Sequence, residues 1–185
     1  MLFGSIIVIW IISEIVGGGL IPMLRRKGKE VTIKDSGSNL VLRVSLYASV
    51  LIAVFLAVKN TAMLPHGFFY TGIILVVVGV IVRQCAVFTL GRFFTLDIGI
   101  QKDQKVVDYG PYRFVRHPSY LGLLIILLGI GIALQSWEGA LAMVVISGLG
   151  IGYRIRVEEK VLVSELGDDY IRYMKRTRRL IPFVF

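Results

Sequence analysis

The sequence has a single cysteine, Cys85, and only two histidines among its 185 residues. One cysteine excludes an intramolecular disulfide, and so few Cys and His residues leave no cluster that would form a zinc site. Charged residues make up only 18% of the chain, whereas soluble domains contain about 25%. These shortages exclude a disordered protein and a nucleic-acid-binding tail, and they argue against a soluble enzyme.

Apolar residues, by contrast, are abundant. Hydrophobic residues make up 56% of the chain, and its mean hydropathy is +0.77. Lys and Arg outnumber Asp and Glu by 21 to 12, which gives a formal net charge of +9. In so apolar a chain this charge favours contact with anionic lipid head groups over contact with nucleic acid. The length is that of a single domain.

Five apolar stretches are each long enough, or nearly so, for the roughly 17–25 residues that a membrane-spanning helix needs. They predict an all-α integral membrane protein with five transmembrane helices. The first stretch is expected to be a mature helix, because it lacks the basic leading region and cleavage site of a signal peptide. The polar break Gln135-Ser136-Trp137-Glu138 predicts a C-terminal helical hairpin with Trp137 at the membrane interface. The stretches are residues 2–23, 40–58, 67–90 and two within 119–153.

The basic residues lie almost entirely on one side of these helices. Of the 21 Lys and Arg residues, 18 follow the first or third helix or belong to the tail, whereas the opposite side has only Lys59. The positive-inside rule therefore predicts an N-terminus outside the cell and a cytoplasmic C-terminus. The functional surface is then expected on the cytoplasmic side, where the loop 91–118 and the tail 154–185 lie.

The tail is predicted to form two helices. The first covers about residues 154–165 and ends near Gly167, because glycine commonly terminates helices. Asp168 or Asp169 suits the N-cap of a second, short helix that ends near Arg179.

The segment before the fourth helix is the first candidate for chemistry. Pro118 suits the first turn of a helix, which places His117 at the helix N-terminus, where unpaired backbone N–H groups attract anions. Arg113 and Arg116 add positive charge, and three tyrosines add flat surfaces and hydroxyl groups. The segment is either a ligand site or an interfacial belt that anchors the helix.

Glu158 and Glu159 follow the fifth helix. Adjacent carboxylates point to different faces of a helix, so only one of them is expected to face a pocket. Arg154 precedes Glu158 by four residues and shares its face, where the two can pair. They form either a surface ion pair or a ligand site in which a carboxylate for a cation lies beside an arginine for an anion.

Arg83 is a charged residue placed within the third helix. Such a residue either faces the interior of a helix bundle, where it is a functional candidate, or extends to the membrane interface. The chain has no glycine-rich phosphate loop, no Ser/His/Asp arrangement and no inverted repeat. The sequence therefore lacks motifs typical of enzymes that catalyse hydrolysis or phosphoryl transfer, and it lacks the inverted repeat typical of many transporters.

Several segments in the second half of the chain stand in a defined order. They are Arg83-Gln84-Cys85-Ala86-Val87-Phe88-Thr89-Leu90-Gly91, Arg116-His117-Pro118-Ser119-Tyr120-Leu121-Gly122, Glu158-Glu159, Leu166-Gly167-Asp168-Asp169-Tyr170-Ile171-Arg172-Tyr173 and Arg179-Leu180-Ile181-Pro182. This set, over about residues 80–183, resembles the isoprenylcysteine carboxyl methyltransferase (ICMT) family, and the related phospholipid methyltransferases share part of it. Integral membrane sterol reductases have a similar Arg-His-Pro-x-Tyr segment, so the specificity lies in the ordered set.

The resemblance implies a cytoplasmic site for S-adenosyl-L-methionine between the loop and the tail. Glu158 would hold the ammonium group of this cofactor, and the N-terminus of the fourth helix would hold its carboxylate. Arg154 would face the methyl acceptor and Arg83 would lie near the reaction centre, so these two are the candidate catalytic residues, and Tyr153 would join them in binding the substrate. The cofactor-binding residues carried over from the family are Gln104, Lys105, Val106, Val107, Tyr112, His117, Pro118, Ser119, Tyr120 and Glu158.

The implied acceptor is a lipid-like molecule from the bilayer, and the carboxylate of an isoprenylcysteine is favoured. A carboxylate is already ionised at neutral pH, whereas an amine must first lose a proton to a general base. The candidate bases are only His117, Glu159 and Tyr153. A phospholipid amine or a small thiol is the alternative acceptor. An NADPH-dependent sterol or lipid reductase and a non-enzymatic membrane scaffold are the alternative functions.

The chain is expected to form one membrane methyltransferase domain over residues 1–185. Residues 1–66 share no motif with the family and are expected to shape the entry of the acceptor. Residues 67–185 are expected to form the cofactor site. Membrane lipids and the lipid-like acceptor are the expected partners, with no nucleic acid and no metal.

Overall fold

The computed structural model describes residues 4, 11–12, 31–35, 37–59, 64–101 and 103–181. The predicted first transmembrane helix, residues 2–23, lies outside the described residues except at three positions. Most of the described residues belong to four long helices. These helices are α3 (Ser38–Lys59), α4 (Gly67–Leu90), α5 (Pro118–Ala133) and α6 (Trp137–Arg176).

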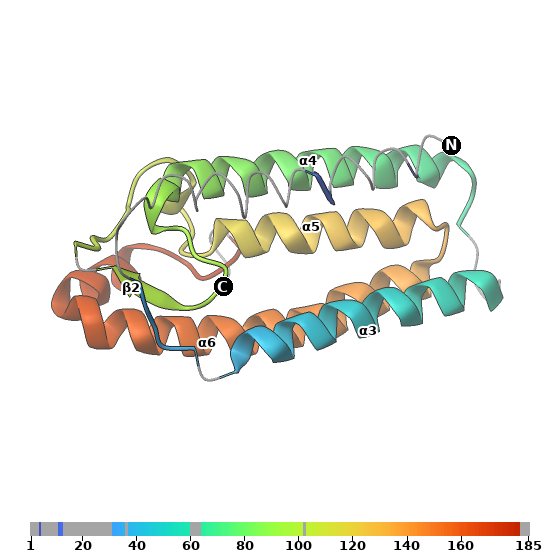
Figure 1. Cartoon of the computed structure of the whole chain (residues 1–185). Helices are drawn as coiled ribbons and strands as arrows, with labels where there is room; N and C mark the ends of the chain where they lie inside the picture. Colours follow the sequence, from blue (N-terminus) through green and yellow to red (C-terminus); the bar gives the residue numbers. More distant parts are fainter. Residues whose placement is uncertain are drawn as a thin grey trace.

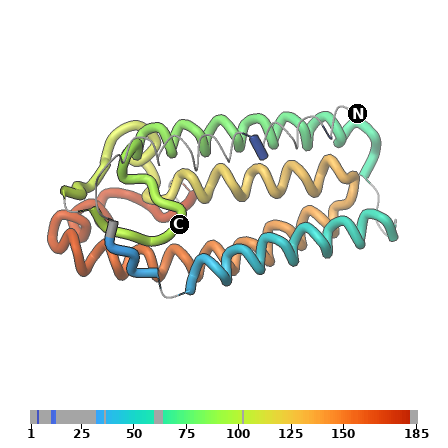
Figure 2. The backbone as a smooth tube through the Cα atoms, in the orientation of Figure 1, coloured from blue at the N-terminus to red at the C-terminus, as the bar shows by residue number. Residues whose placement is uncertain are grey.

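The four helices lie side by side along a common direction (Figures 1 and 2). α4 packs against α5, α3 packs against α6, and α5 also contacts α6. The loop between α4 and α5, the segment before α3 and the tail gather at one end of the bundle (Figure 1). The connection between α5 and α6 lies at the opposite end.

The predicted C-terminal hairpin is confirmed. α5 ends at Ala133 and α6 begins at Trp137, with Gln135 between them in the left-handed region at φ 59°. The hydroxyl of Ser136 caps α6 by accepting a hydrogen bond of 3.0 Å from the backbone nitrogen of Gly139. The chain therefore reverses within three residues, and Trp137 is exposed at the turn.

Glycines allow α4 and α5 to approach closely. A Cβ atom added to Gly79 would lie 2.7 Å from the carbonyl oxygen of Gly122, and one added to Gly122 would lie 2.7 Å from the backbone nitrogen of Arg83. The two backbones can touch only because these positions lack a side chain. The contact places Arg83 beside the first turns of α5.

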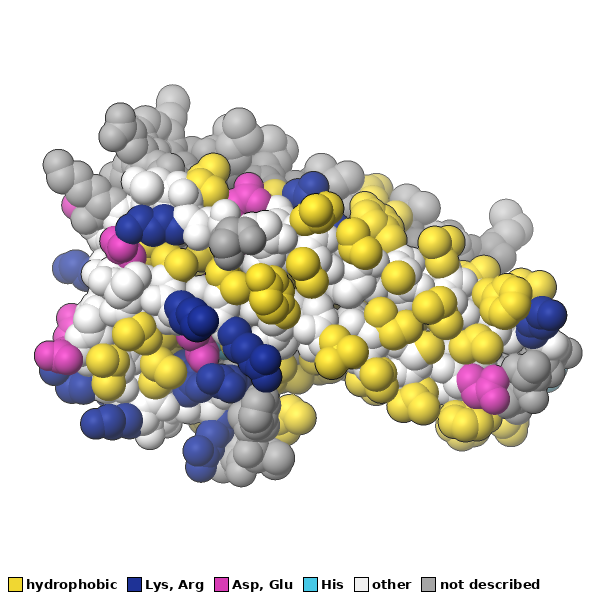
Figure 3. Space-filling view, turned by 90° about the horizontal axis from the view of Figure 1, so that it is seen from below, with side chains coloured by type: hydrophobic (Ala, Val, Ile, Leu, Met, Phe, Trp, Pro, Cys, Tyr) yellow, Lys and Arg dark blue, Asp and Glu magenta, His cyan; other side chains and the backbone are white. Residues whose placement is uncertain are grey.

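Three of the described helices, α3, α4 and α6, are long and apolar enough to cross a membrane. α5 is apolar but has 16 residues. The chain is therefore a predominantly helical integral membrane protein, and the total of five spans stays a prediction. Apolar side chains cover the long part of the molecule, and most charged side chains gather at the end that carries the loops (Figure 3).

The helix predicted over about residues 154–165 is present, and it is continuous with the membrane helix, because α6 runs through Arg154 from Trp137. α6 has 40 residues, and only Gly167 within it departs from helical geometry, with φ 54° and ψ −133°. No proline interrupts residues 137–176, so the helix is free to propagate through Arg154. Gly167 ends the first part of the helix, as expected for glycine in this conformation.

The second part of α6 ends at Arg176, three residues earlier than predicted. The residues that follow pair with the chain before α5 instead of extending the helix. The backbone nitrogens of Arg116 and His117 donate to the carbonyl oxygens of Arg178 and Arg179 at 2.7 and 3.0 Å. These long-range hydrogen bonds outweigh the helical preference of the sequence and fasten the tail to the segment before α5.

A two-stranded antiparallel sheet ties the chain before α3 to the loop after α4. Its strands are β1 (Val31–Ile33) and β2 (Gly99–Gln101). Just after β1, the Lys34 side chain forms an ion pair with Glu165 of α6. The start of α3 is thereby held against both the loop and the tail.

Candidate active site

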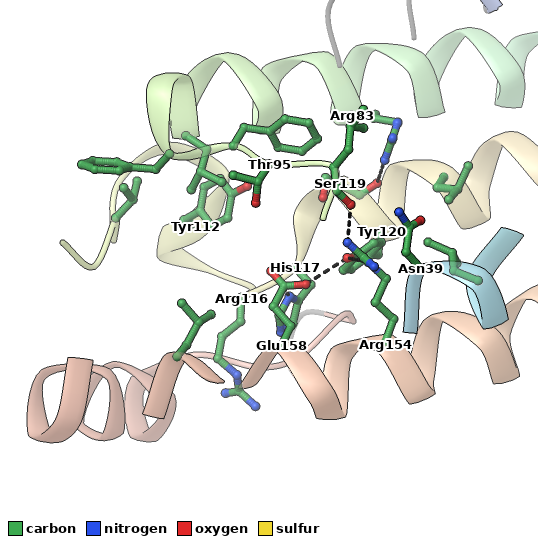
Figure 4. Close-up of a pocket in the computed structure, with 18 of the residues that line it drawn as sticks. Asn39, Arg83, Thr95, Tyr112, Arg116, His117, Ser119, Tyr120, Arg154 and Glu158 are labelled. Carbon is green, nitrogen blue, oxygen red and sulfur yellow. Dashed lines mark hydrogen bonds and ion pairs between the residues drawn. The ribbon is translucent and has the colours of Figure 1, made fainter. Parts of the chain in front are cut away.

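A cavity of about 950 Å³ lies among α3, α4, α5, α6 and the loop between α4 and α5 (Figure 4). Its volume is at the upper end of the range of typical small-molecule pockets. Ionisable groups gather in one part of it, and the remainder is apolar. The predicted site residues that line it are Arg83, Lys105, Val106, Val107, Tyr112, His117, Ser119, Tyr120, Arg154 and Glu158.

Arg83 faces the interior of the bundle rather than the membrane interface. Its side chain is buried, and Nη1 donates to the carbonyl oxygen of Ser119 at 3.1 Å. Figure 4 shows the side chain extending from α4 toward the first turn of α5. The close glycine-mediated contact between these helices makes this short reach possible, so the interior placement is the correct one of the two that the sequence left open.

Arg154 and Glu158 both face the cavity from α6, one helical turn apart, and they do not pair directly. The hydroxyl of Tyr120 lies between them. It donates to Glu158 Oε2 at 2.9 Å and accepts from Arg154 Nε at 2.7 Å. The cavity therefore presents a carboxylate and a guanidinium as two separate groups.

Arg154 is also held by Ser38 and Asp35, which lie outside the cavity wall, and by Leu96 in the wall. Its Nη1 donates to the Ser38 hydroxyl at 3.3 Å and lies 3.6 Å from Asp35 Oδ2, while Nη2 donates to the carbonyl oxygen of Leu96. Burial alone would raise the pKa of Asp35. Hydrogen bonds from Ser38 and Asn39 outweigh this effect and hold the pKa below its ordinary value, so Asp35 is an ionised counter-ion for Arg154.

Glu159, the neighbour of Glu158, is not in the cavity wall and belongs to a buried ion cluster. Its Oε1 accepts from Arg116 Nε at 2.8 Å, and its Oε2 accepts from Arg179 Nε at 3.0 Å. The side chains of Glu159 and Arg116 are only 5% and 8% exposed. The cluster joins α6, the segment before α5 and the tail. As predicted, only one of the two glutamates faces the pocket.

His117 stands between the two glutamates. Its Nε2 is 3.4 Å from Glu159 Oε1, and its Nδ1 is 4.0 Å from Glu158 Oε1. It is buried directly before Pro118, the first residue of α5, as the sequence predicts. His117 therefore connects the buried ion cluster to the wall of the cavity.

Aromatic rings line the cavity toward the tail. Tyr112 comes from the short 3-10 helix η3 (Gly110–Arg113), and burial raises the pKa of its hydroxyl, so this ring stays neutral. Its carbonyl oxygen accepts a 2.8 Å hydrogen bond from the hydroxyl of Tyr173 in α6. Tyr170 lies in the same wall. This part of the cavity offers flat, neutral surfaces.

The apolar part of the cavity follows α3. Side chains of this helix line it from Leu42 to Leu51, which corresponds to about 14 Å at the helical rise of about 1.5 Å per residue. Leu123 and Leu127 of α5 complete the wall. The α3 residues of this apolar arm are Leu42, Leu46, Tyr47, Val50 and Leu51.

Three predicted site residues do not line this cavity. Tyr153 is 43% exposed on α6; a rotation of about 100° per residue separates it from the inward-facing Arg154. Pro118 is buried as the first residue of α5. Gln104 lines a second pocket, and its side-chain oxygen accepts a 3.0 Å hydrogen bond from the backbone nitrogen of Gln101.

Other residues reach the site without having been predicted. Asn39 of α3 and Thr95 of the loop line the cavity, and Asp35 supports Arg154. The sequence offers one signal for Asp35: an aspartate three residues before Ser38, ahead of an apolar helix, is typical of an N-cap. That signal predicts the cap, which the structure has, but not the contact with Arg154.

Among the described residues, no group of three or more His, Cys, Asp and Glu side chains could hold a metal ion.

Comparison of folds gives the class of the protein. The chain matches the solved structure of the eukaryotic intramembrane Ras methyltransferase ICMT with a TM-score of 0.68 and 25% sequence identity, over 98% of this chain and 66% of that chain. The fold is thus that of an intramembrane methyltransferase.

A sequence profile identifies the family. The profile of the isoprenylcysteine carboxyl methyltransferase (ICMT) family matches residues 72–164, just over half of the chain. The chain belongs to this family, as the ordered motifs indicated.

Two named relatives show how far the similarity extends. Protein-S-isoprenylcysteine O-methyltransferase A of Arabidopsis thaliana is 36% identical over 115 residues, which are 61% of this chain and 58% of the relative. The Saccharomyces cerevisiae protein-S-isoprenylcysteine O-methyltransferase is 32% identical over 115 residues, which are 61% of this chain and 48% of the relative. The matched region therefore spans about half the length of these relatives.

Proposed function

We propose that the protein transfers a methyl group from S-adenosylmethionine to the carboxylate of an isoprenylcysteine held in the membrane. The observation that carries the proposal is the cavity itself. It joins the Glu158 carboxylate and the Arg83 and Arg154 side chains to a largely apolar arm along α3. The names of the Arabidopsis and yeast relatives support the same reaction.

The residues present fit the methyl donor. The amino-acid end of S-adenosylmethionine is a zwitterion and needs one anionic and one cationic partner. Glu158 offers a carboxylate in the cavity wall. The N-terminus of α5 beside His117 offers the positive end of the helix dipole, although Pro118 has no N–H and those of His117, Tyr120 and Leu121 are bonded within the protein. Tyr112 and its aromatic neighbours offer flat surfaces for the adenine ring.

The other end of the cavity fits a lipid with an acidic head. Arg154 and Arg83 would hold the acceptor carboxylate, since arginine forms strong charge-assisted hydrogen bonds with carboxylates. The apolar arm along α3 would bury the isoprenoid chain, which the hydrophobic effect favours in proportion to the area buried. This assignment gives α3 the role expected for residues 1–66, the shaping of the acceptor site.

The chemistry is an in-line displacement. When bound, the donor supplies a sulfonium methyl group, to which a carboxylate oxygen forms a bond while the carbon–sulfur bond breaks and its electron pair stays on sulfur. The arginines fix the position of the carboxylate, and the apolar walls exclude water. Orientation and exclusion of water are sufficient to supply a large rate enhancement.

The positions of the candidate bases support a carboxylate acceptor over an amine. Glu159 is bound within the ion cluster, and Tyr153 is outside the cavity wall. Both ring nitrogens of His117 face carboxylates. An amine acceptor needs a base that removes its proton, whereas an ionised carboxylate does not.

We also propose that the site faces the cytoplasm. The loop after α4 and the tail lie at one end of the bundle (Figure 1), and charged side chains gather there on the face seen in Figure 3. The described Lys and Arg residues belong mostly to this loop and tail. The positive-inside rule assigns such an end to the cytoplasmic side.

Calorimetry and turnover of the detergent-purified protein test the proposal. Saturable binding of S-adenosylhomocysteine, no binding of NADPH, and base-labile methyl ester formed on N-acetyl-S-farnesylcysteine are the expected results. Methylation of phosphatidylethanolamine alone would move the acceptor to a phospholipid amine. Binding of NADPH alone would indicate a reductase, and binding of neither ligand to folded protein would refute the enzyme.

A further inference from the structure

The arrangement of Arg154 and Glu158 departs from what their spacing favours. Residues four apart on a helix are neighbours, and oppositely charged side chains at this spacing normally attract each other into contact. Here the Tyr120 hydroxyl separates them, bonded to Arg154 Nε at 2.7 Å and to Glu158 Oε2 at 2.9 Å. An opposing attraction must therefore hold the guanidinium away from Glu158.

Asp35 supplies that attraction. Its Oδ2 lies 3.6 Å from Arg154 Nη1, and its side chain is 8% exposed. Oδ1 accepts from the Ser38 hydroxyl at 2.6 Å, and this hydroxyl also accepts from Arg154 Nη1 at 3.3 Å. Asp35 is itself fixed as the cap of α3, since it accepts backbone hydrogen bonds from Ser38 at 2.9 Å and Asn39 at 3.1 Å. A rigidly held carboxylate thus faces Nη1 of the guanidinium, whereas the Tyr120 hydroxyl that contacts Glu158 bonds to Nε.

We propose that Asp35 is a positioning residue that keeps Arg154 from pairing with Glu158, so that each remains available to a different ligand. The proposal rests on the proposed function, in which Glu158 holds the ammonium group of the methyl donor and Arg154 holds the carboxylate of the acceptor. Asp35 touches neither ligand and acts only through Arg154. Arg154 can bind Asp35 and the acceptor carboxylate at the same time, because its guanidinium has five N–H donors.

Removal of the Asp35 charge would release Arg154 toward Glu158. The new ion pair would then compete with the donor ammonium for the same carboxylate. Asp35→Asn is the suitable variant, because its amide oxygen can still accept from Ser38 at the start of α3. It removes the charge together with the second acceptor, which Asn39 uses. Glu165→Gln is the matched control, since the Lys34–Glu165 ion pair also links the segment before α3 to α6 but does not involve Arg154.

The test is calorimetric titration of S-adenosylhomocysteine into the full-length protein in detergent. We expect the Kd to rise by about tenfold in Asp35→Asn, the size of effect of one partly buried charge-assisted contact, and to stay unchanged in Glu165→Gln. In the Arg154→Ala background the guanidinium that Asp35 holds is gone, so Asp35→Asn should have no further effect on the Kd. Arg154→Ala alone should bind S-adenosylhomocysteine at least as tightly as the unmodified protein while losing methyl transfer.

Tyr120→Phe provides a second route to the same result with the cap of α3 intact. It removes the separating hydroxyl, so it should weaken binding, and the double variant Tyr120→Phe/Arg154→Ala should regain it. Unchanged binding of S-adenosylhomocysteine in Asp35→Asn would overturn the inference. Binding that Asp35→Asn weakens equally in the Arg154→Ala background would overturn it as well. Both results would leave the proposed function intact. Failure of the unmodified protein to bind S-adenosylhomocysteine would instead refute the proposed function.

Discussion

Neutralising Glu159 tests how the tail is held against the membrane domain. In Glu159→Gln the amide oxygen can still accept one hydrogen bond, but the negative charge shared by Arg116, Arg179 and His117 is lost. Arg116 is then left buried without its counter-ion. Loss of one partner of a buried ion pair costs about 3–5 kcal/mol, and the retained hydrogen bond favours the lower value of about 3 kcal/mol.

Thermal unfolding in detergent measures this loss. For a domain of this size, about 1 kcal/mol lowers Tm by roughly 2–4 °C, so Glu159→Gln should melt about 6–12 °C below the unmodified protein. Asp169→Asn is the control, because it removes a carboxylate from the exposed Arg172–Asp169 ion pair on the same helix. Exposed pairs contribute about 0–1 kcal/mol, so this variant should melt within a few degrees of the unmodified protein.

Limited trypsin digestion gives an independent measure of the same contact. Cleavage after Arg178 should be faster in Glu159→Gln, because the tail loses the ion pair that fixes Arg179 beside its backbone hydrogen bond to His117. A melting temperature within about 2 °C of the unmodified protein, together with unchanged cleavage, would refute the reasoning that the cluster fastens the tail.

Three further predictions concern packing, capping and pH. Gly79→Leu should separate α4 from α5 and lower the melting temperature by several degrees, because its side chain would meet the backbone of Gly122; Gly148→Leu, where the added Cβ meets nothing within 4 Å, is the control. Ser136→Ala should destabilise the hairpin by about 1 kcal/mol in thermal unfolding through loss of the α6 cap, whereas Ser136→Asn should not. Folding lowers the pKa of Asp35 from 3.8, so its stabilising contribution is complete above pH 3.8 and is lost as the pH falls through the lower folded pKa. In acid titrations of stability, the difference between the unmodified protein and Asp35→Asn should therefore shrink over that interval. A difference that stays constant would contradict this reasoning.

Local patterns were sufficient to predict much of the helical framework. Length and hydropathy located α3 and α4, and the polar break at Gln135 predicted the hairpin, because these features depend on residues adjacent in the sequence. The placement of Glu158 toward the pocket and Glu159 away from it follows from helical periodicity, which is also local. That the tail helix joins the membrane helix was not predicted, because a change from apolar to charged composition does not by itself show where a helix ends.

Contacts between segments that are distant in the chain could not be predicted from the sequence. Nothing near Asp35 indicates that it faces Arg154, because that contact depends on how α3 packs against α6. The early end of the tail helix has the same cause, since its residues pair with the chain before α5. Tyr153 was expected to bind the substrate, but it does not line the cavity, because adjacent helical residues such as Tyr153 and Arg154 point in different directions.

The fastening of the tail has a consequence for the order of events during synthesis. Protein chains emerge from the ribosome from the N-terminus onward, so the membrane helices are made before Arg178 and Arg179. His117 and Arg116 can therefore obtain their final partners only after translation has passed those two residues. A nascent chain with all its described helices already inserted would still lack the backbone partners that hold Arg116 and His117 beside the cavity.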